Sequence, residues 1–379
     1  MSTLIQSIRN NVIGDELNIS TPFGEKPLVY ADYTASGRSL QCIESFIQQK
    51  VLPWYANTHT ESSFTGRQTT RLREEARATI RDAVNGTEDD LVIFCGSGAT
   101  AAVNKLIDIL NMRLPADLDT EYQLSAQIPA NDRPVVFIGP YEHHSNELPW
   151  RESIADLISI PLDSDGNLDI NELETQLKKY QQRKLKIGSF SAASNVTGLK
   201  TDTVAISRLL HRYGALAFWD YAAAAPYTAI DMTGEENAEG DSRKDAVFIS
   251  PHKFIGGPGT PGILVVKKNM LRNSVPSVPG GGTVSFVTPE DHRYITDGER
   301  REEGGTPAIV ESIRAGLVFK LQQQVGTAQI EAREKVFIQR AIGVWQKNPN
   351  IEILGRADKE RLSIVSLQII CEGHYLHYG

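Results

Sequence analysis

Short apolar runs alternate along this chain with longer stretches in which apolar residues recur every three or four positions. The first pattern is typical of buried strands and the second of amphipathic helices, and their alternation predicts an α/β fold with a mainly parallel sheet between helices. The expected strands are Leu91–Cys95, Pro134–Ile138, Leu185–Phe190, Ala215–Trp219, Ala246–Ile249 and Gly262–Val266. The expected helices are Arg67–Val84, Thr100–Asn111, Thr201–Tyr213 and Pro307–Gln324.

Other stretches indicate how the chain divides into domains. Pro115–Arg133 is polar without a clear period, and we expect an excursion between a helix and a strand there. The glycine- and proline-rich Val278–Thr283 is expected to leave the main domain. From about Ala308 the pattern becomes long helices followed by one strand-like run, Leu362–Cys371. Because one strand cannot form a sheet, we expect this smaller α+β domain to be incomplete or to depend on the N-terminal segment. The expected division is an N-terminal segment (1–29) that packs with the small domain, a large domain (30–307) and the start of the small domain (308–379).

Composition and charge narrow the range of functions. With 379 residues, 40% of them hydrophobic, the chain can bury a large core. Its formal charge of −8 gives no electrostatic footprint for nucleic acid. The three cysteines form no CxxC pair, which argues against a disulfide framework or a zinc site. No apolar run approaches the roughly 18 residues of a membrane helix, and the N-terminus lacks a signal-peptide core. We therefore expect a cytoplasmic protein without membrane contact.

The most informative motif is SPHKFIGGPG, Ser250–Gly259, which follows an expected strand and ends in a glycine-rich turn. A lysine among small residues at a strand end, such as Lys253, can closely approach a cofactor aldehyde. Desolvation there lowers the pKa of the amine and favours imine formation. An ordinary surface lysine before a turn would give the same pattern, so the motif alone leaves both interpretations open.

Two further motifs lie at expected strand ends. In Phe94–Thr100, a glycine turn leads into a helix start whose backbone N–H groups and dipole suit a phosphate, and the Thr100 hydroxyl can add a hydrogen bond. Many α/β turns are glycine-rich, however, and the spacing is not that of a dinucleotide site. In Phe218–Pro226, Asp220 follows an apolar strand, where ligands bind in such sheets. Its carboxylate can pair with a protonated pyridine nitrogen, or it can simply cap the next helix.

The fourth motif, Tyr141–Trp150, places two adjacent histidines at a strand exit. His143 and His144 can stack on an aromatic ring and move protons. They also suggest a metal site, but the nearby Glu142 and Glu147 complete no recognisable ligand spacing. We therefore expect no metal.

Together these motifs resemble the class V aminotransferase-like group of fold-type I pyridoxal 5′-phosphate (PLP) enzymes, in particular the cysteine desulfurase and selenocysteine lyase branch. The resemblance runs nearly end to end, because several blocks follow in the family's order and approximate spacing. The blocks are YADYTAS at Tyr30–Ser36, NTH at Asn57–His59, RLREEAR at Arg71–Arg77, EHHSNELPW at Glu142–Trp150, SNVTG at Ser194–Gly198, SPHKFIGGPG at Ser250–Gly259 and GGTP at Gly304–Pro307.

The resemblance implies a role for each matching residue. Lys253 would hold PLP as a Schiff base, Asp220 would pair with the pyridine nitrogen, and His143 would stack over the ring. Asn195 would lie near the ring face and the substrate. Thr306 would reach the phosphate of a partner subunit, which implies a homodimer. The residues expected to bind the phosphate of the same subunit's cofactor are Ala99, Thr100, Ser250 and His252.

The sequence departs from the family's pattern in two ways. The glutamine that usually follows the aspartate by three residues, and bonds to the phenolic oxygen of PLP, is replaced by Ala223, which cannot make this bond. Desulfurases also use a cysteine on a mobile loop and a downstream arginine for the substrate carboxylate, and both are expected beyond the end of this sequence. We expect Cys371 to be a buried strand cysteine, Cys95 to pack beside the phosphate turn and Cys42 to pack on an amphipathic helix. Little desulfurase turnover is therefore expected of this chain, although it should bind PLP.

The expected function is that of a PLP-dependent enzyme acting on a small amino acid, with cysteine or selenocysteine favoured and a sulfur-acceptor protein as a partner. Ala223 keeps other class V reactions open, namely transamination, epimerisation and β-elimination. A further alternative is a non-catalytic or truncated paralogue that only binds PLP or dimerises.

Overall fold

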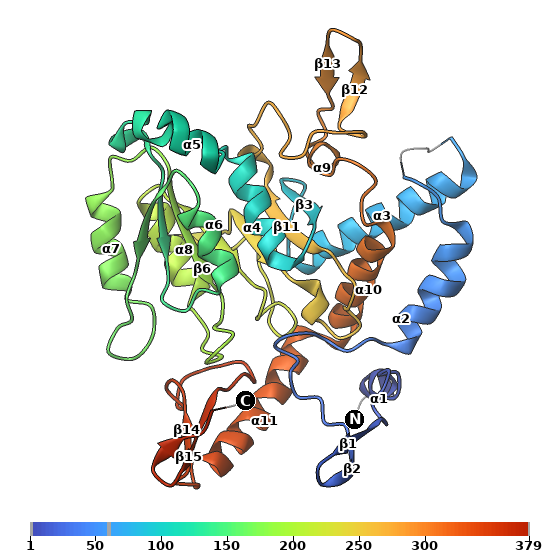
Figure 1. The fold of residues 1–379 in the computed structure, drawn as a ribbon, viewed down its shortest axis with the longest axis vertical. Coiled ribbons are helices and arrows are strands. Elements are labelled where there is room, and N and C mark those ends of the chain that lie inside the picture. The colour runs from blue at the N-terminus through green and yellow to red at the C-terminus, as the bar shows by residue number, and fades with distance from the viewer. Residues whose placement is uncertain (1–2, 59–61, 378–379) are drawn as a thin grey trace.

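A seven-stranded sheet forms the centre of the computed structural model, which describes residues 3–58 and 62–377 (Figure 1). The strand order is β3-β11-β10-β7-β6-β4-β5. Strand β11 runs antiparallel to both of its neighbours, and the remaining neighbouring pairs are parallel. The mainly parallel α/β sheet expected from the sequence is thus confirmed. The strands are β3 (Asp90–Cys95), β4 (Val135–Ile138), β5 (Asp156–Ser159), β6 (Lys186–Ser191), β7 (Leu216–Asp220), β10 (Ala246–Ile249) and β11 (Gly262–Lys267).

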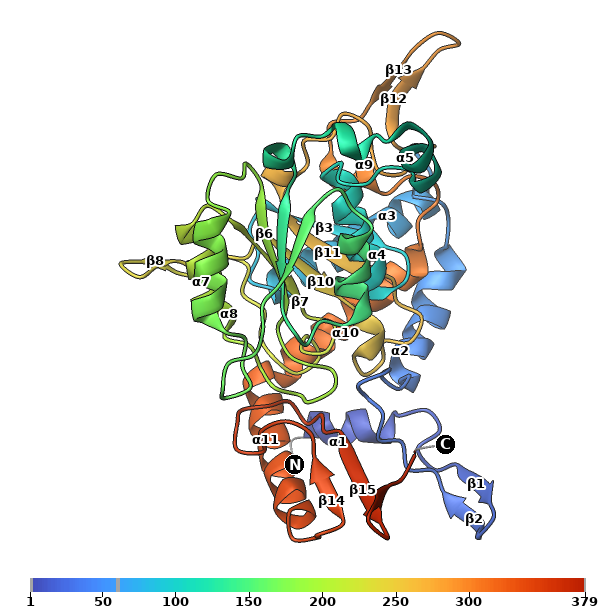
Figure 2. The same ribbon diagram turned by 60° about the vertical axis from the view of Figure 1, so that its left-hand side comes forward.

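Helices cover both faces of this sheet, because successive side chains of each strand point to opposite sides. In β3, for example, Val92 and Phe94 join the core on one face, whereas Leu91 and Ile93 join the core on the other. Figure 2 shows α7 and α8 on one side of the sheet and α4 on the other. The first face is covered by α3 (Phe64–Ala83), α7 (Ile170–Lys179), α8 (Thr203–Arg212) and α10 (Ile309–Val325), and the second by α4 (Gly98–Ile109) and α6 (Leu148–Arg151).

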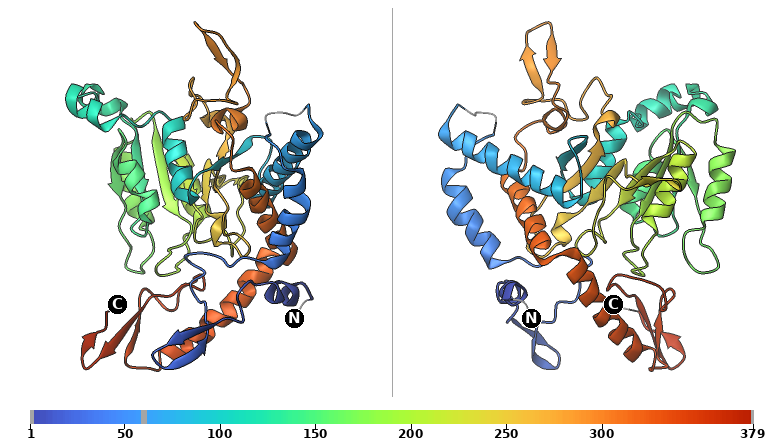
Figure 3. Two further views of the ribbon diagram at one scale, coloured as in Figure 1. Left: turned by 45° about the vertical axis from the view of Figure 1, so that its right-hand side comes forward. Right: turned by 180° about the vertical axis from the view of Figure 1, so that it is seen from behind.

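The N-terminal and C-terminal segments lie together at one end of the molecule (Figures 2 and 3). A single glycine, Gly326, separates α10 from the next long helix, which leads into a three-stranded sheet of order β14-β15-β16. One cavity is lined by Ile8 of the first helix and by Phe337 of the last helix, so the two ends of the chain share it. The elements at this end are α1 (Thr3–Asn10), β1 (Asn18–Thr21), β2 (Gly24–Pro27), α11 (Thr327–Trp345), β14 (Ile351–Ile353), β15 (Leu367–Cys371) and β16 (His374–Tyr375).

The remaining elements lie in the connections. The polar excursion contains a helix that the sequence pattern did not predict, α5 (Ala116–Tyr122). After the glycine-rich stretch, a hairpin projects from the body, as Figure 1 shows. None of the described helices is long and apolar enough to cross a membrane. The other short elements are α2 (Gln41–Phe46), β8 (Glu236–Asn237), β9 (Gly240–Asp241), β12 (Val284–Val287), β13 (His292–Tyr294) and α9 (Gly298–Glu302).

Two of the three expectations about cysteine burial are wrong. Cys371 does lie on a strand, β15, but its side chain is exposed, and no residue of that strand is fully buried. The apolar run indicated a strand correctly, yet burial also requires a second layer over that side chain. Cys42 on α2 is exposed as well, whereas Cys95 is buried at the end of β3, as expected.

Candidate active site

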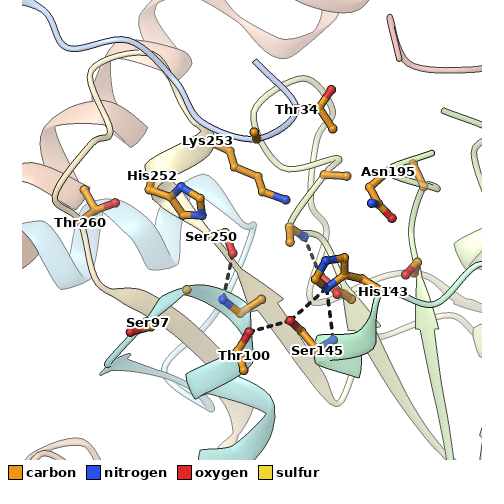
Figure 4. A pocket seen from close by; sticks show the side chains of 18 of the residues that line it. Thr34, Ser97, Thr100, His143, Ser145, Asn195, Ser250, His252, Lys253 and Thr260 are labelled. Atoms are coloured by element: carbon orange, nitrogen blue, oxygen red, sulfur yellow. Dashed lines mark hydrogen bonds between the residues drawn. The ribbon is translucent and has the colours of Figure 1, made fainter. Parts of the chain in front are cut away.

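A cavity of about 700 Å³ opens where β6, β7 and β10 end. It brings together all the residues that the sequence suggested for the site except Thr306. In Figure 4, the side chains of Lys253, His143 and Asn195 point toward the same space. The suggested residues that line it are Ala99, Thr100, His143, Asn195, Asp220, Ser250, His252 and Lys253.

One end of the cavity is a cradle of backbone amides and hydroxyls at the start of α4. The Ala99 N–H donates to Ser250 Oγ over 2.8 Å, which joins the helix start to the end of β10. Gly98 has a φ of +57°, and a Cβ at this position would lie 3.1 Å from Ser250 Oγ and 3.8 Å from His252 Nε2. Only glycine leaves this space open without backbone strain. The donors and the open space fit a phosphate group.

The amine of Lys253 stands in the middle of the cavity, on the short 3₁₀ turn Pro251–Lys253 that follows β10. Burial lowers the pKa of this amine, and the carboxylates of Asp220 and Asp32 oppose the shift. Burial raises the pKa of Asp220, while a hydrogen bond from the Ala222 N–H, over 2.7 Å, favours the charged carboxylate. An amine with a lowered pKa, facing an acid at the end of a central strand, is suited to form an imine with an aldehyde.

The imidazole of His143 is held by hydrogen bonds that continue to the phosphate cradle (Figure 4). The Ser145 N–H donates to His143 Nδ1 over 3.1 Å, and Ser145 Oγ lies 3.0 Å from the same nitrogen. Ser145 Oγ in turn lies 2.6 Å from Thr100 Oγ1. Burial lowers the pKa of His143 below its usual 6.5, so the ring is mainly neutral near pH 7. A neutral ring can stack on an aromatic cofactor and accept a proton.

Several residues of the cavity were not predicted from the sequence. Asp32 belongs to the YADYTAS block that supported the resemblance, but it was given no role there. Ala223 lines the wall, where the family's glutamine would stand. Ser97 and Gly98 belong to the glycine turn that the sequence suggested for a phosphate, although they were not named individually. The lining residues that sequence reasoning missed are Asp32, Thr34, Ala35, Ser145, Ser191, Ala193, Ala222 and Thr260.

One suggested residue lies elsewhere. Thr306 is exposed outside the cavity, and its Oγ1 accepts a hydrogen bond from Asn57 Nδ2 over 3.0 Å. His59 of the NTH block lies outside the described residues. Within the described part of the chain, no three His, Cys, Asp or Glu side chains are placed to hold a metal ion, and His143 and His144 are therefore not part of such a cluster.

The comparisons with known proteins agree with this architecture. The model of the family "Aminotransferase class-V" matches residues 29–376. A probable cysteine desulfurase from Halalkalibacterium halodurans is 27% identical over 347 residues, which cover 90% of this chain and 78% of the relative. A probable cysteine desulfurase from Streptomyces coelicolor is 25% identical over 337 residues, which cover 88% of this chain and 75% of the relative.

Solved structures show the same fold. The apo structure of a cysteine desulfurase from Thermococcus onnurineus superposes with a TM-score of 0.76 at 20% identity, covering 96% of this chain and 82% of that one. A cysteine desulfurase from Escherichia coli gives a TM-score of 0.69 at 19% identity, with coverage of 90% and 78%. Since the family model spans most of the sequence, the chain belongs to the class V aminotransferase family, whose members are PLP-dependent enzymes.

Proposed function

We propose that this chain is a PLP-dependent enzyme of the cysteine desulfurase type. The observation that carries the proposal is the convergence of three groups in one cavity: the amine of Lys253, the carboxylate of Asp220 and the helix-start cradle at Gly98. These are the three features that a pyridine aldehyde with a phosphate group needs. When bound, PLP would supply an electron sink for negative charge that develops at the substrate Cα.

Each of three cavity residues would have a different role, which follows from its position. Asp220 lies at the end of β7, where its buried carboxylate can hold a proton on a pyridine nitrogen. The imidazole of His143, which lines the same cavity, would stack on the ring. The Lys253 amine, whose pKa burial lowers, can carry a proton to and from the substrate Cα once it is free.

The substrate class follows from the relatives. Those described above are called cysteine desulfurases, and we propose that this chain likewise acts on cysteine or selenocysteine, passing the sulfur to a thiol acceptor. Among the described residues, no cysteine lines the cavity. Because Cys371 is exposed, the burial that argued against it and led to the expectation of little turnover does not apply. It is therefore the candidate sulfur acceptor within this chain that a Cys371→Ser variant tests directly.

The experiment is an incubation of the PLP-loaded protein with L-cysteine and dithiothreitol, followed by measurement of sulfide, alanine and pyruvate. A desulfurase forms alanine and, with the reductant, sulfide in equal amounts. Lys253→Ala should abolish both, because the amine is the proposed attachment point. Absence of turnover with cysteine and selenocysteine in a protein that binds PLP would contradict the proposed reaction.

Ala223 favours a second candidate, β-elimination. Its methyl group stands in the cavity wall and cannot donate a hydrogen bond to the phenolic oxygen of a cofactor. Without that donor, the electron distribution in the ring differs from the family's usual state. Elimination converts cysteine and water into pyruvate, ammonia and sulfide, so pyruvate in place of alanine identifies it.

We further propose that the enzyme works as a homodimer with Thr306 near the partner's cofactor. Its exposure outside its own cavity supports this role, since its hydroxyl is accessible to a second copy. PLP would then strengthen dimerisation by linkage. Sedimentation at micromolar protein with saturating PLP should show a dimer, and a monomer under these conditions would contradict the proposal.

A further inference from the structure

Glu142, which directly precedes His143, is an acid to which the proposed function gives no role. Its carboxyl lies behind the catalytic cavity and lines a second cavity, with Ser191 forming part of the wall of both. In the sequence, Glu142 opens the EHHSNELPW block, but the motif alone assigned it no role. Its contacts in the fold set it apart.

The carboxylate of Glu142 accepts four hydrogen bonds. Oε1 accepts from the Ser191 N–H over 3.0 Å and from the Gly139 N–H over 3.3 Å. Oε2 accepts from Ser191 Oγ over 2.8 Å and from Asn146 Nδ2 over 2.6 Å. Two donors belong to the loop after β4, and the other two belong to the last residue of β6. The side chain therefore ties the loop that carries His143 to the carboxyl end of a central strand.

Both ends of this tie reach the catalytic cavity. On the loop side, His143 is the next residue along the chain, and Asn146 anchors the following turn to β6 by accepting from Ser189 Oγ over 2.6 Å. On the strand side, Ser191 lies opposite Asp220 in the register of β6 and β7. The carboxylate of Glu142 therefore lies between the loop that carries His143 and the strand end that adjoins Asp220.

We propose that Glu142 is a positioning residue of this site, whose carboxylate fixes the His143 loop against the end of β6 and so sets where the imidazole stands relative to Asp220. The inference rests on the proposed function, because it concerns the ring that His143 would cover. It adds a residue that acts through His143 without touching substrate or cofactor. A glutamine at this position can keep one acceptor oxygen for the backbone N–H groups of Gly139 and Ser191, but its NH2 group would then face the Nδ2 donor of Asn146.

The charge state of Glu142 connects this geometry to pH. All four neighbours donate, so the contacts fit the ionised carboxylate. Burial opposes ionisation, as does the negative charge of Asp220, and the pKa of Glu142 is raised to about 7. Protonation as the pH falls through this value removes acceptor capacity and loosens the loop. The other ionisable groups that line the second cavity with Glu142 are Tyr141, Asp163, Asp169, Lys200 and Asp202.

The test compares Glu142→Gln and Glu142→Asp with a matched control, Glu147→Gln. Glu147 lies in the same segment but pairs with the solvent-facing Arg151. In the PLP-loaded enzyme, Glu142→Gln should lower kcat by about 10- to 100-fold with KM nearly unchanged, because a reacting group displaced by about 1 Å can cost about 100-fold. The rise of wild-type kcat as pH increases through about 7 should disappear in this variant. Glu142→Asp keeps the charge and should recover part of kcat, and Glu147→Gln should behave as wild type.

A second readout uses the protein without cofactor. The chemical shift of the His143 ring, observed by NMR, should show a step near pH 7 as the neighbouring Glu142 titrates, in addition to the titration of the imidazole itself. We expect this step in the wild type and in Glu147→Gln but not in Glu142→Gln. If Glu142→Gln does not fold, Ser191→Ala removes one of the four donors and should weaken both signals. Wild-type kcat, pH profile and ring titration in these variants would overturn the proposal. If the wild type turned over no amino acid, the proposed function would fail, and the ring titration would still decide the role of Glu142.

Discussion

Replacing Glu303 by glutamine should destabilise the edge of the sheet from which the phosphate cradle starts. Glu303 follows α9, and its carboxylate accepts from the Phe94 N–H of the edge strand β3 over 2.7 Å. The same carboxylate pairs with Arg73 at 2.6 Å and with Arg77 at 2.9 Å. It therefore covers part of an otherwise open strand edge and pairs with two guanidinium groups of α3. Three residues beyond Phe94, at Ser97, the cavity begins.

The magnitude follows from the burial of this cluster. The side chains of Arg73, Arg77 and Glu303 are 5%, 2% and 3% exposed. Removing one partner of a buried ion pair costs about 3–5 kcal/mol, because it leaves an uncompensated charge. Glutamine keeps one acceptor oxygen for the Phe94 N–H, so we expect the lower end, about 3 kcal/mol. The control is Glu75→Gln on the same helix, whose partner Arg71 is 73% exposed, and it should change stability by less than about 0.5 kcal/mol.

The assay is urea unfolding of the cofactor-free protein, followed by tryptophan fluorescence at several pH values. Burial raises the pKa of Glu303, but the charges of Arg77 and Arg73 outweigh it, and the net pKa lies below the usual 4.5. A lowered carboxyl pKa contributes stability that is present above 4.5 and lost as pH falls through the folded pKa. The gap between wild type and Glu303→Gln should therefore be full near pH 7 and shrink below about pH 4. A midpoint equal to that of Glu75→Gln at neutral pH would refute this reasoning.

Three further predictions follow from single residues. Gly98→Val should lower PLP affinity by at least about tenfold in a fluorescence titration, because a side chain at a φ of +57° meets Ser250 Oγ. The far-ultraviolet circular dichroism spectrum should stay unchanged. Wild-type PLP affinity in this variant would contradict the proposal that the start of α4 binds the phosphate. Burial lowers the pKa of Lys244 to about 8, although the negative charge of Asp231 opposes this shift. The free energy of unfolding should therefore rise by up to about 3 kcal/mol between pH 8 and 10.5, because only the unfolded chain still binds the proton there. Lys244→Met should remove this rise, and an equal rise in both proteins would contradict the prediction. Burial raises the pKa of Cys95 to about 12, so a thiol reagent should label Cys42 and Cys371 in the native protein but Cys95 only after unfolding.

The strands of the central sheet could be predicted because both of their faces are covered by helices, which requires continuous apolar runs. All six residues of β3 are buried, and the run Leu91–Cys95 marks it clearly. The strand β5, Asp156–Ser159, was missed because it lies at the sheet edge and none of its residues is fully buried. Its sequence therefore carries polar residues that hide the pattern. The prediction that Cys371 is buried was wrong for a related reason. An apolar run indicates a strand but does not reveal whether another layer of the structure covers that strand.

The gathering of Lys253, Asp220 and His143 could be foreseen because each follows a strand, and the carboxyl ends of parallel strands meet at one edge. Asp32 could not be placed in this way, since it precedes every strand of the central sheet. Its loop reaches the cavity through long-range backbone contacts, such as the hydrogen bond from the Gly37 N–H to the His252 carbonyl over 2.8 Å. A Cβ on Gly37 would lie 1.8 Å from the Phe254 carbonyl oxygen, so this approach depends on a glycine. Such contacts are a property of the folded chain and leave little signal in the local sequence.

In the proposed function, the cavity holds PLP on the amine of Lys253. The most direct measurement is borohydride reduction of the PLP-loaded protein, followed by digestion and mass spectrometry of the lysine-containing peptides. We predict a pyridoxyl group on the peptide that contains Lys253, its absence in Lys253→Ala, and its retention in the control Lys268→Ala, whose lysine is exposed and lies outside the cavity. A pyridoxyl group on another lysine, or on none, would contradict the account.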